Sequence, residues 1–394
     1  MENLVFADRV SSLEGSAIRE MFKLLGNPEI ISFAGGAPAP EIFPVGELSE
    51  IAREVLLEKG DRALQYGITE GYTPLRSFVS ERMRDKGNMK AEDDVIITTG
   101  GQQAIDLAAK TLVNEGDVVL VESPSFVGGL NSLRSYNAKL IGIPVQDDGM
   151  DVDAVEEEAK KQKIKMVYAI TTFQNPSGIT MSLEKRKRLL QLAEKYNFYV
   201  LEDNPYEELR FSGEAVQSIK SLDTTGRVIY AGSFSKVLSA GIRLGWVLAS
   251  KEIFEKMVVV KQVSDVHTPV LNQMMAMEFF KKYSLDAHIE KSRKLYGERC
   301  SVMLGALDEH FPEGCTYTRP EGGIFLWCSL PGHIDTAKLL RLALEKNIAF
   351  VPGSTCMVDM SAHTSQLRLN YSLTANEKIE EGIKRLSEVI ITQI

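Results

Sequence analysis

The sequence predicts an α/β fold in which a large, mostly parallel sheet carries helices on both faces. Three observations support this. Short apolar runs alternate with helical segments over about residues 46–285. These runs end on small, polar or charged residues, where ligands of parallel sheets bind. The last third changes to short strands between helices, so we expect a large domain over 46–285 and a smaller α+β domain from 1–45 and 286–394.

Size and composition fit a globular protein with more than one domain. The chain has 394 residues, of which 44% are hydrophobic and 25% charged. The net charge of −9 argues against a nucleic-acid or anionic-membrane partner. We find no long apolar run, no signal peptide and no CxxC pair among the four cysteines, which predicts a cytoplasmic protein. The five histidines lack metal-ligand spacing, so no metal site is expected.

The N-terminal region is predicted to contain a helix, a short strand and a glycine-rich loop. SAIREMFKLL has amphipathic spacing and closes on Gly26-Asn27-Pro28. In IISFAGGAPAPEIFP, Gly35-Gly36 either brings the backbone close to another group or only turns the chain. Helices are expected from Leu48 to Lys59 and from Pro74 to about Lys86. Tyr66 lies in the polar loop between them and does not fit a simple core role.

The middle of the chain alternates regularly between strands and helices. Its apolar strands lie in VIITT, VVLVES, KMVYAI, FYVLED, VIYAGS and RLGWVLAS. Residues 251–300 then have helical patterns, and we assign their Met-rich face to core packing. Short strands follow in GGIFLWCSL, NIAFVPGS and QLRLNYS. This order predicts that the sheet precedes the smaller C-terminal module.

The stretch from Ile229 to Trp246 holds an unusual group of side chains. It begins as an apolar strand and breaks into small residues around Lys236, with Arg243 in a glycine-flanked setting. Ser233 and Ser235 can donate to phosphate oxygens, and Arg243 can donate two bonds to one phosphate. A lysine desolvated among cations has a lowered pKa and can attack a carbonyl. The stretch fits a lysine that holds a phosphorylated aldehyde as a Schiff base, or an ordinary junction with a solvated lysine.

Other strand ends carry groups that suit the same site. Thr99-Gly100-Gly101-Gln102 opens a helix whose first amides favour a phosphate, although many α/β turns look alike. Asp203 ends FYVLED, where it could keep a pyridine nitrogen protonated or serve as an N-cap or buried ion pair. Tyr206 could reach a phenolate oxygen three residues later. Asn175 in FQNPSG either offers a second donor at this edge or only forms a turn.

The combined pattern resembles the class I/II aminotransferases of fold type I, which use pyridoxal 5′-phosphate. It consists of Asn175, Asp203-Asn204-Pro205-Tyr206, Ser233-x-Ser235-Lys236 and Arg243 in this order. FAGGAPAPEIFP, QYGITEGYTPLR, TTGGQQA, FQNPSG and GSFSKVLSAGIRLGW extend the likeness over nearly the whole chain. It is closest to the subgroup of 2-aminoadipate (LysN-like) aminotransferases, kynurenine aminotransferases and the C-terminal domain of MocR regulators. The resemblance implies a sheet of seven-stranded type in the large domain.

The resemblance implies a cofactor-binding role for each matching residue. Lys236 would form the Schiff base, and Asp203 would pair with the pyridine nitrogen. Asn175 and Tyr206 would bond the ring oxygen, and Phe126 would stack on the ring where many members have Tyr. The groups that would hold the phosphate are Ser233, Ser235, Arg243, Gly101 and Gln102.

The resemblance also implies how a substrate is bound. Arg368 in QLRLNYS would clamp the α-carboxylate, helped by Asn175 and the backbone at Gly36. Arg19, with Ser16 alongside, resembles the position from which some relatives recognise a distal carboxylate. A solvated helix arginine is the alternative interpretation of Arg19.

The implied activity is transfer of an amino group between an amino acid and a 2-oxo acid such as 2-oxoglutarate. The donor would be 2-aminoadipate or glutamate, or an aromatic or branched-chain amino acid, with ping-pong kinetics through Lys236. A homodimer is implied, in which Tyr66 reaches the phosphate of the neighbouring subunit's cofactor. A pyridoxal-phosphate-dependent β-lyase or decarboxylase remains an alternative, because such enzymes use the same groups. A MocR-like regulator without its DNA-binding domain is disfavoured by the acidic net charge.

Overall fold

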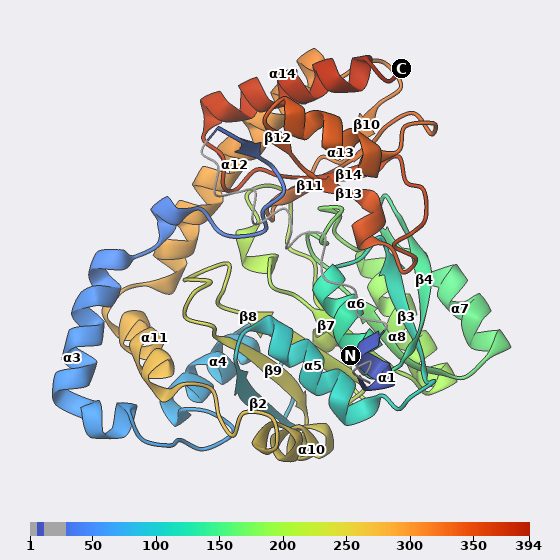
Figure 1. Ribbon diagram of the computed structural model, residues 1–394. Helices are drawn as coiled ribbons and strands as arrows, with labels where there is room; N and C mark the ends of the chain where they lie inside the picture. Colours follow the sequence, from blue (N-terminus) through green and yellow to red (C-terminus); the bar gives the residue numbers. More distant parts are fainter. Residues whose placement is uncertain (1–5, 12–28) are drawn as a thin grey trace, which may run out of the picture.

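The computed structural model describes residues 6–11 and 29–394 of the chain. Its largest sheet has eight strands and forms the centre of the lower half of the molecule in Figure 1. In chain order the strands are β2 (Asp93–Thr98), β3 (Val118–Ser123), β4 (Lys139–Gln146), β5 (Gly149–Met150), β6 (Ile164–Ala169), β7 (Tyr199–Asp203), β8 (Val228–Ser233) and β9 (Gly245–Ser250). They lie in the order β2-β9-β8-β7-β6-β3-β4-β5.

The sheet is mostly parallel, as the sequence predicted. Only the pairs that β9 makes with β2 and β8, and that β5 makes with β4, are antiparallel. The expected sheet of seven-stranded type gains one strand, because the two-residue β5 folds back on the end of β4. The predicted α/β fold class is confirmed.

Both faces of the central strands are buried, which explains why these strands are mainly apolar, whereas β4 near one edge is largely exposed. Along β3, Val119 and Val121 join one hydrophobic cluster and Leu120 joins another. Along β7, Leu201 and Val200 divide between the same two clusters. Because strand side chains alternate, the last two residues of β7 point to opposite faces of the sheet.

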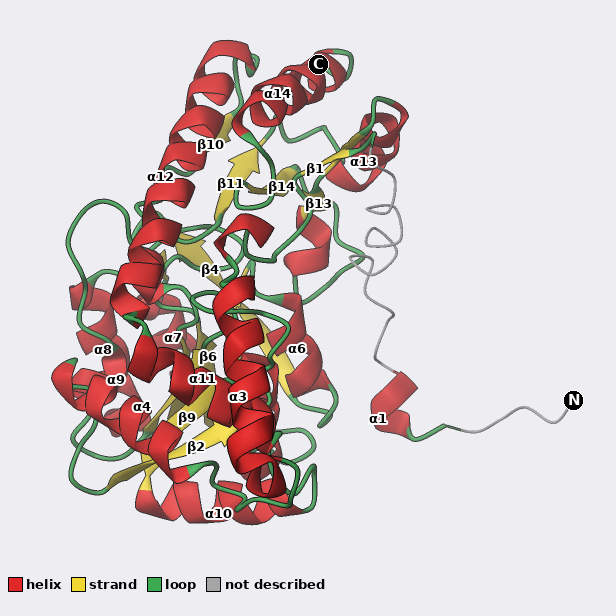
Figure 2. Ribbon diagram, turned by 90° about the vertical axis from the view of Figure 1, so that its left-hand side faces the viewer, coloured by secondary structure: helices red, strands yellow, loops and turns green. Residues whose placement is uncertain are grey.

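Helices cover the two faces. The helices of this part of the chain are α1 (Asp8–Ser11), which lies apart from the sheet, α3 (Val45–Ala63), α4 (Thr73–Asp85), α5 (Gly101–Leu112), α6 (Val127–Arg134), α7 (Val152–Lys161), α8 (Leu183–Tyr196), α9 (Ile219–Leu222), α10 (Lys251–Gln262) and α11 (Val270–Lys282). Figure 2 shows α7, α8 and α9 on one side of the large sheet and α6 on the other. α5 packs against α6, β8 and β9. The helices expected at 48–59 and 74–86 are α3 and α4.

The smaller α+β module lies above the large sheet in Figure 1. One sheet has the order β10-β11-β14-β13, and a second pairs β1 with β12. The strands are β1 (Ile31–Ser32), β10 (Thr316–Tyr317), β11 (Phe325–Ser329), β12 (Ile348–Ala349), β13 (Val351–Pro352) and β14 (Gln366–Asn370). The helices are α12 (Leu285–His310), α13 (Thr336–Glu345) and α14 (Asn376–Ile391), with short 3-10 turns at η1 (Pro40–Ile42) and η3 (Gly353–Cys356). A further 3-10 turn, η2 (Glu207–Leu209), follows β7 of the large sheet.

The N-terminal segment and the last third of the chain meet in this module. Ile31 and Ser32 pair in parallel with Ile348 and Ala349. α12 extends from the large sheet to the module in both views and packs against α14. The domain boundaries at 45/46 and 285/286 stay a prediction. The expected lead-in helix lies outside the described residues.

Three properties of the described residues bear on other functions. None of their helices is long and apolar enough to cross a membrane. Within the same residues, no cluster of three or more His, Cys, Asp or Glu could hold a metal ion. All four cysteines are free thiols.

Candidate active site

A cavity of about 450 Å³ lies at the carboxyl ends of the parallel strands, below the smaller module. Its lining contains most of the residues that the sequence predicted. They are Gly36, Gly101, Gln102, Phe126, Asn175, Asp203, Tyr206, Ser233, Ser235, Lys236, Arg243 and Arg368. Tyr66 lies outside the cavity, with 82% of its surface exposed. Arg19 and Ser16 lie outside the described residues.

Lys236 follows the last residue of β8 by three positions and points into the cavity. Its Nζ donates a hydrogen bond to the carbonyl of Gly36 and lies 5.9 Å from the centre of the Tyr206 ring. Burial, followed by the charges of Arg368 and Arg243, lowers the pKa of Lys236 to about 8. A substantial fraction of this amine is therefore neutral near pH 7 to 8, as a nucleophile toward a carbonyl must be.

Arg243 closes one end of the cavity beside the start of α5. Its guanidinium donates to Ser235 Oγ at 3.4 Å and to the carbonyl of Thr99 at 3.4 Å. A Cβ on Gly100, whose φ is +78°, would lie 2.4 Å from Nη2, so only glycine allows this approach. The first amides of α5 and the positive end of its dipole face the same place. A cation, two serines and a helix N-terminus together form an anion site.

Asp203 is the last residue of β7 and is buried at the inner wall. Its Oδ2 accepts a hydrogen bond from the Tyr168 hydroxyl at 2.9 Å. Burial raises the pKa of Asp203 to about 7, and the Tyr168 bond only partly opposes this rise. Among the described residues no cation forms an ion pair with this carboxylate, so a cationic or N–H donor in the cavity would stabilise its ionised form.

Arg368 comes from β14 of the smaller module and faces Lys236 across the cavity. It donates to Asn175 Oδ1 at 3.0 Å and to the carbonyl of Ala34 at 2.8 Å. Its guanidinium lies 4.2 Å from the centre of the Phe325 ring, and its Nε is buried without a hydrogen-bond partner. A buried guanidinium with an unused donor and, among the described residues, no carboxylate partner suits a carboxylate ligand.

Two aromatic residues of the site were not predicted from the sequence. Tyr168 holds Asp203, and Phe325 lies under Arg368 and edge-on to Tyr206 at 5.8 Å. Each belongs to an apolar run, KMVYAI or GGIFLWC, in which an aromatic residue is expected to be core. No signal in the sequence distinguishes the two roles.

Comparisons with known proteins agree over nearly the whole length of the chain. A family model described as aminotransferase class I and II matches residues 31–386. Aromatic-amino-acid aminotransferase 1 of Thermococcus litoralis is 44% identical over 98% of this chain and 94% of its own. The 2-aminoadipate transaminase of Thermus thermophilus is 42% identical over 98% of this chain and 96% of its own.

Two solved structures are similar in fold and contain a form of the expected cofactor. The kynurenine aminotransferase of Pyrococcus horikoshii, in complex with PMP, has a TM-score of 0.95 and 41% identity, covering 99% of this chain and 97% of its own. LysN of Thermus thermophilus, complexed with N-(5′-phosphopyridoxyl)-L-leucine, has a TM-score of 0.91 and 40% identity, covering 99% and 98%. The cofactor of this protein is pyridoxal 5′-phosphate. The chain therefore belongs to the aminotransferase class I and II family.

Proposed function

We propose that this aminotransferase moves the amino group of amino acids with large apolar or aromatic side chains to a 2-oxo acid such as 2-oxoglutarate. One observation carries the proposal. Lys236, Arg243 and Arg368 line one cavity, and in the described part of the chain none of them forms an ion pair with a carboxylate. Three such cations suit a ligand set with an aldehyde, a phosphate and an α-carboxylate.

The residues of the cavity fit pyridoxal 5′-phosphate. The anion site would take the phosphate through Arg243 and its neighbours Ser233, Ser235, Gly101 and Gln102. Asp203, which lacks a cation among the described residues, would face the ring nitrogen. Phe126 would stack on the ring, while Asn175 and Tyr206, which bond to each other, would donate to its oxygen. These assignments account for the unpaired charges on both sides of the cavity.

The chain's own groups would then perform the proton transfers. The bound cofactor supplies an aldehyde that accepts the amino group and a ring that stabilises negative charge. Lys236 Nζ would hold the cofactor until a substrate amine replaces it, after which the free amine takes the proton from the substrate Cα and later returns it. A pKa of about 8 lets this amine act as base and then as acid near neutral pH. Asp203 would keep a proton on the ring nitrogen, and Arg368 would fix the substrate carboxylate.

The substrate side chain would contact the cavity-lining residues that hold neither the cofactor nor the α-carboxylate. Apart from the groups already assigned, the wall is largely apolar: Ala34, Ala37, Ile105, Val127, Ile170, Ala240 and Phe325. Lys236, Arg243 and Arg368 are already assigned to the aldehyde, the phosphate and the α-carboxylate. The described lining contains no further cation that could bind a distal carboxylate. The apolar wall supports aromatic and branched-chain donors. We propose Arg19, with Ser16, as the group that accepts glutamate, 2-aminoadipate and 2-oxoglutarate.

We further propose a homodimer with shared active sites. Tyr66 contacts His267 edge-on at 5.7 Å, which places two loops side by side. These loops expose several apolar side chains: Leu64, Tyr66, Ile68, Val263 and Val266. Such a patch supports burial against a second copy. In that dimer Tyr66 would reach the phosphate in the partner's cavity.

The test is a panel of amino donors measured by the single-turnover spectral change of the bound cofactor. Phenylalanine, tyrosine and leucine should convert it, and 2-oxoglutarate should reverse the change. Arg19→Ala should slow glutamate and 2-aminoadipate relative to leucine by about tenfold or more, because a buried carboxylate loses its cation. Equal slowing of all donors would contradict the role of Arg19. Pyruvate and ammonia from cysteine without a 2-oxo acid would instead indicate a β-lyase.

A further inference from the structure

Two loops of the cavity are joined behind its wall by Glu122 and Gln174. One loop follows β3 and carries Phe126, and the other follows β6 and carries Asn175. Glu122 and Gln174 are each 1% exposed, and neither lines the cavity. Neither side chain would touch a ligand in the cavity, so their hydrogen bonds act on the site through the two loops.

Gln174 connects the loops through both ends of its side-chain amide. Its Nε2 donates to the carbonyl of Pro124 at 2.7 Å and to Glu122 Oε2 at 3.2 Å. Its Oε1 accepts from the amide of Ser177 at 2.8 Å, which closes the turn that contains Asn175. The amide therefore ties the loop before Phe126 to the loop of Asn175.

Glu122 anchors this connection to the sheet. Its Oε2 also accepts the backbone N–H of Ile170 at 2.9 Å, directly after β6. Burial, opposed by these two hydrogen bonds and reinforced by the charge of Asp203, raises the pKa of Glu122 to about 8. Burial of a carboxyl group away from water costs free energy, and the two hydrogen bonds that Glu122 accepts offset part of this cost.

The fixed loops carry groups that touch the ligands of the proposed function. Asn175 Oδ1 holds Arg368, and the Asn175 side chain also bonds to Tyr206. Phe126 lies in the cavity wall and begins α6 as its N-cap residue. A shift between the loops would move Phe126 relative to Asn175 and therefore change the ring and carboxylate sites together.

We propose that Glu122 and Gln174 are positioning residues that hold Phe126 and Asn175 in register for cofactor and substrate. The inference rests on the proposed function. It assigns the effect to the hydrogen bonds of Glu122 and not to its charge, because an amide oxygen could accept the same two N–H groups. Glutamine should therefore replace Glu122, and alanine should not.

The experiment compares the holoenzymes of Gln174→Ala, Glu122→Ala and Glu122→Gln with wild type. For the two alanine variants we expect the KM for the amino donor to rise about tenfold or more. The reason is that a displaced Asn175 would no longer hold Arg368 in place for the substrate carboxylate. The visible circular dichroism per bound cofactor should fall, since it reports how the ring is held. Glu122→Gln should keep KM within about threefold of wild type and retain the visible signal.

Asn88→Ala is the matched control. Asn88 is a buried amide that does not line the cavity, and its Oδ1 accepts from Ser218 at 2.6 Å. It should lower the melting temperature without changing KM or the visible signal. The proposal is overturned if Gln174→Ala and Glu122→Ala behave like this control, or if Glu122→Gln fails as the alanine variant does. A wild-type protein without a bound-cofactor signal would instead contradict the proposed function.

Discussion

Glu202 and Asp203 are neighbouring buried carboxylates at the end of β7. They point to opposite faces of the sheet and have different hydrogen-bond partners. Glu202 accepts from the amides of Ile219 and Lys220 at 3.0 and 2.8 Å and from Thr171 Oγ1 at 2.7 Å. Asp203 accepts from Tyr168. One carboxylate is satisfied by the protein, and the other depends on a group that enters the cavity.

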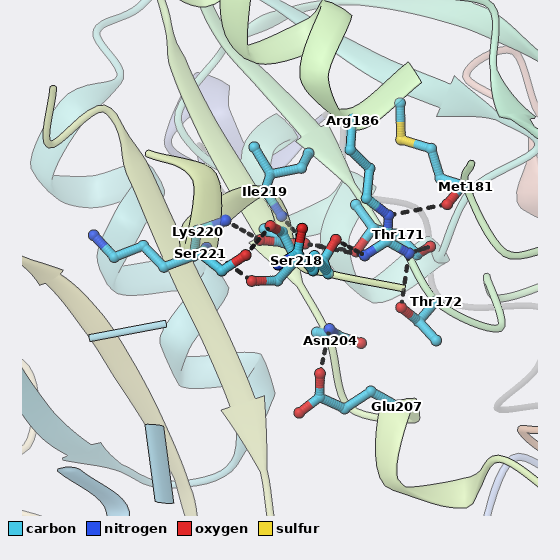
Figure 3. A network of polar contacts seen from close by, with 12 residues as sticks. Thr171, Thr172, Met181, Arg186, Asn204, Glu207, Ser218, Ile219, Lys220 and Ser221 are labelled. Carbon is cyan, nitrogen blue, oxygen red and sulfur yellow. Dashed lines mark hydrogen bonds and ion pairs between the residues drawn. The ribbon is translucent and has the colours of Figure 1, made fainter. Parts of the chain in front are cut away.

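The cations on the two faces differ in the same way. Figure 3 shows Arg186 directed toward Thr171, Thr172 and the carbonyl of Met181, and its Nη1 lies 3.9 Å from Glu202 Oε1. Lys236 and Arg243, on the cavity side, form no ion pair within the described residues. Satisfied charges mark a structural network, and unsatisfied charges mark a binding site.

Removal of Arg186 should have the largest effect on stability. Arg186→Met leaves Glu202 without its counter-charge and several carbonyls without a donor, so we expect a loss of about 3–5 kcal/mol in urea unfolding. Arg188→Met on the same helix is the control. Arg188 is about half exposed, and Glu156 keeps its bonds to Lys195 and Tyr196, so the loss of stability should be much smaller. Equal losses of unfolding free energy in Arg186→Met and Arg188→Met would contradict the view that the buried Arg186 network stabilises the fold more than a surface ion pair does.

Removal of Asp203 should mainly affect activity. Asp203→Ala should lower kcat about 10²–10³-fold, because the carboxylate stabilises positive charge on the ring nitrogen throughout the reaction. The variant should fold normally, as its far-UV circular dichroism would show. Retention of wild-type kcat would contradict the assigned role of Asp203.

The reactivity of Lys236 should follow its lowered pKa. The rate at which the cofactor-free protein captures pyridoxal should rise with pH through a midpoint near 8, because only the neutral amine attacks. Arg243→Met removes one of the positive charges that lower this pKa, so the midpoint should move upward and capture at pH 7 should slow by roughly twofold to tenfold. Pyridoxal lacks the phosphate, which limits the confounding loss of the Arg243 contact. A midpoint that does not move would contradict this electrostatic account.

The smallest effect concerns Asp203 in the cofactor-free protein. Its folded pKa, raised to about 7, lies above that of an unfolded aspartate, so its contribution favours folding at low pH and is lost as the pH rises from about 4 through 7. Asp203→Asn should therefore stabilise the cofactor-free protein at pH 8 by at least about 1 kcal/mol and have little effect at pH 4. Thermal melts of both proteins at the two pH values measure this difference. Destabilisation at pH 8 would mean that the ionised group already has a partner.

Much of the cavity could be predicted because its residues lie at strand ends. Asn175, Asp203 and Lys236 follow three neighbouring strands, and parallel strands bring their carboxyl ends to one edge. The apolar runs identified these strands, and the family resemblance assigned the three side chains to one cofactor site. The fold class rested on the same alternation.

Other features depend on information that a local pattern does not contain. Tyr168 reaches Asp203 because β6 and β7 adjoin with Tyr168 opposite Leu201, and this register is not visible in KMVYAI. Glu122 did carry a signal, a charge at the end of the apolar run VVLVES, but the same pattern fits a solvated strand end. β9 runs antiparallel to both of its neighbours, β2 and β8. A local pattern does not show this direction, because β2 and β8 lie far apart from each other in the sequence.

The central claim is that the unsatisfied lysine of the cavity holds the cofactor. Treatment of the purified protein with borohydride fixes pyridoxal phosphate to the amine that binds it, and peptide mapping by mass spectrometry then locates the modified residue. The account predicts a single phosphopyridoxyl group on Lys236, and none on Lys220, which is buried in an ion pair with Asp93 at 3.0 Å. Modification of another lysine, or retained labelling and turnover in Lys236→Ala, would contradict it.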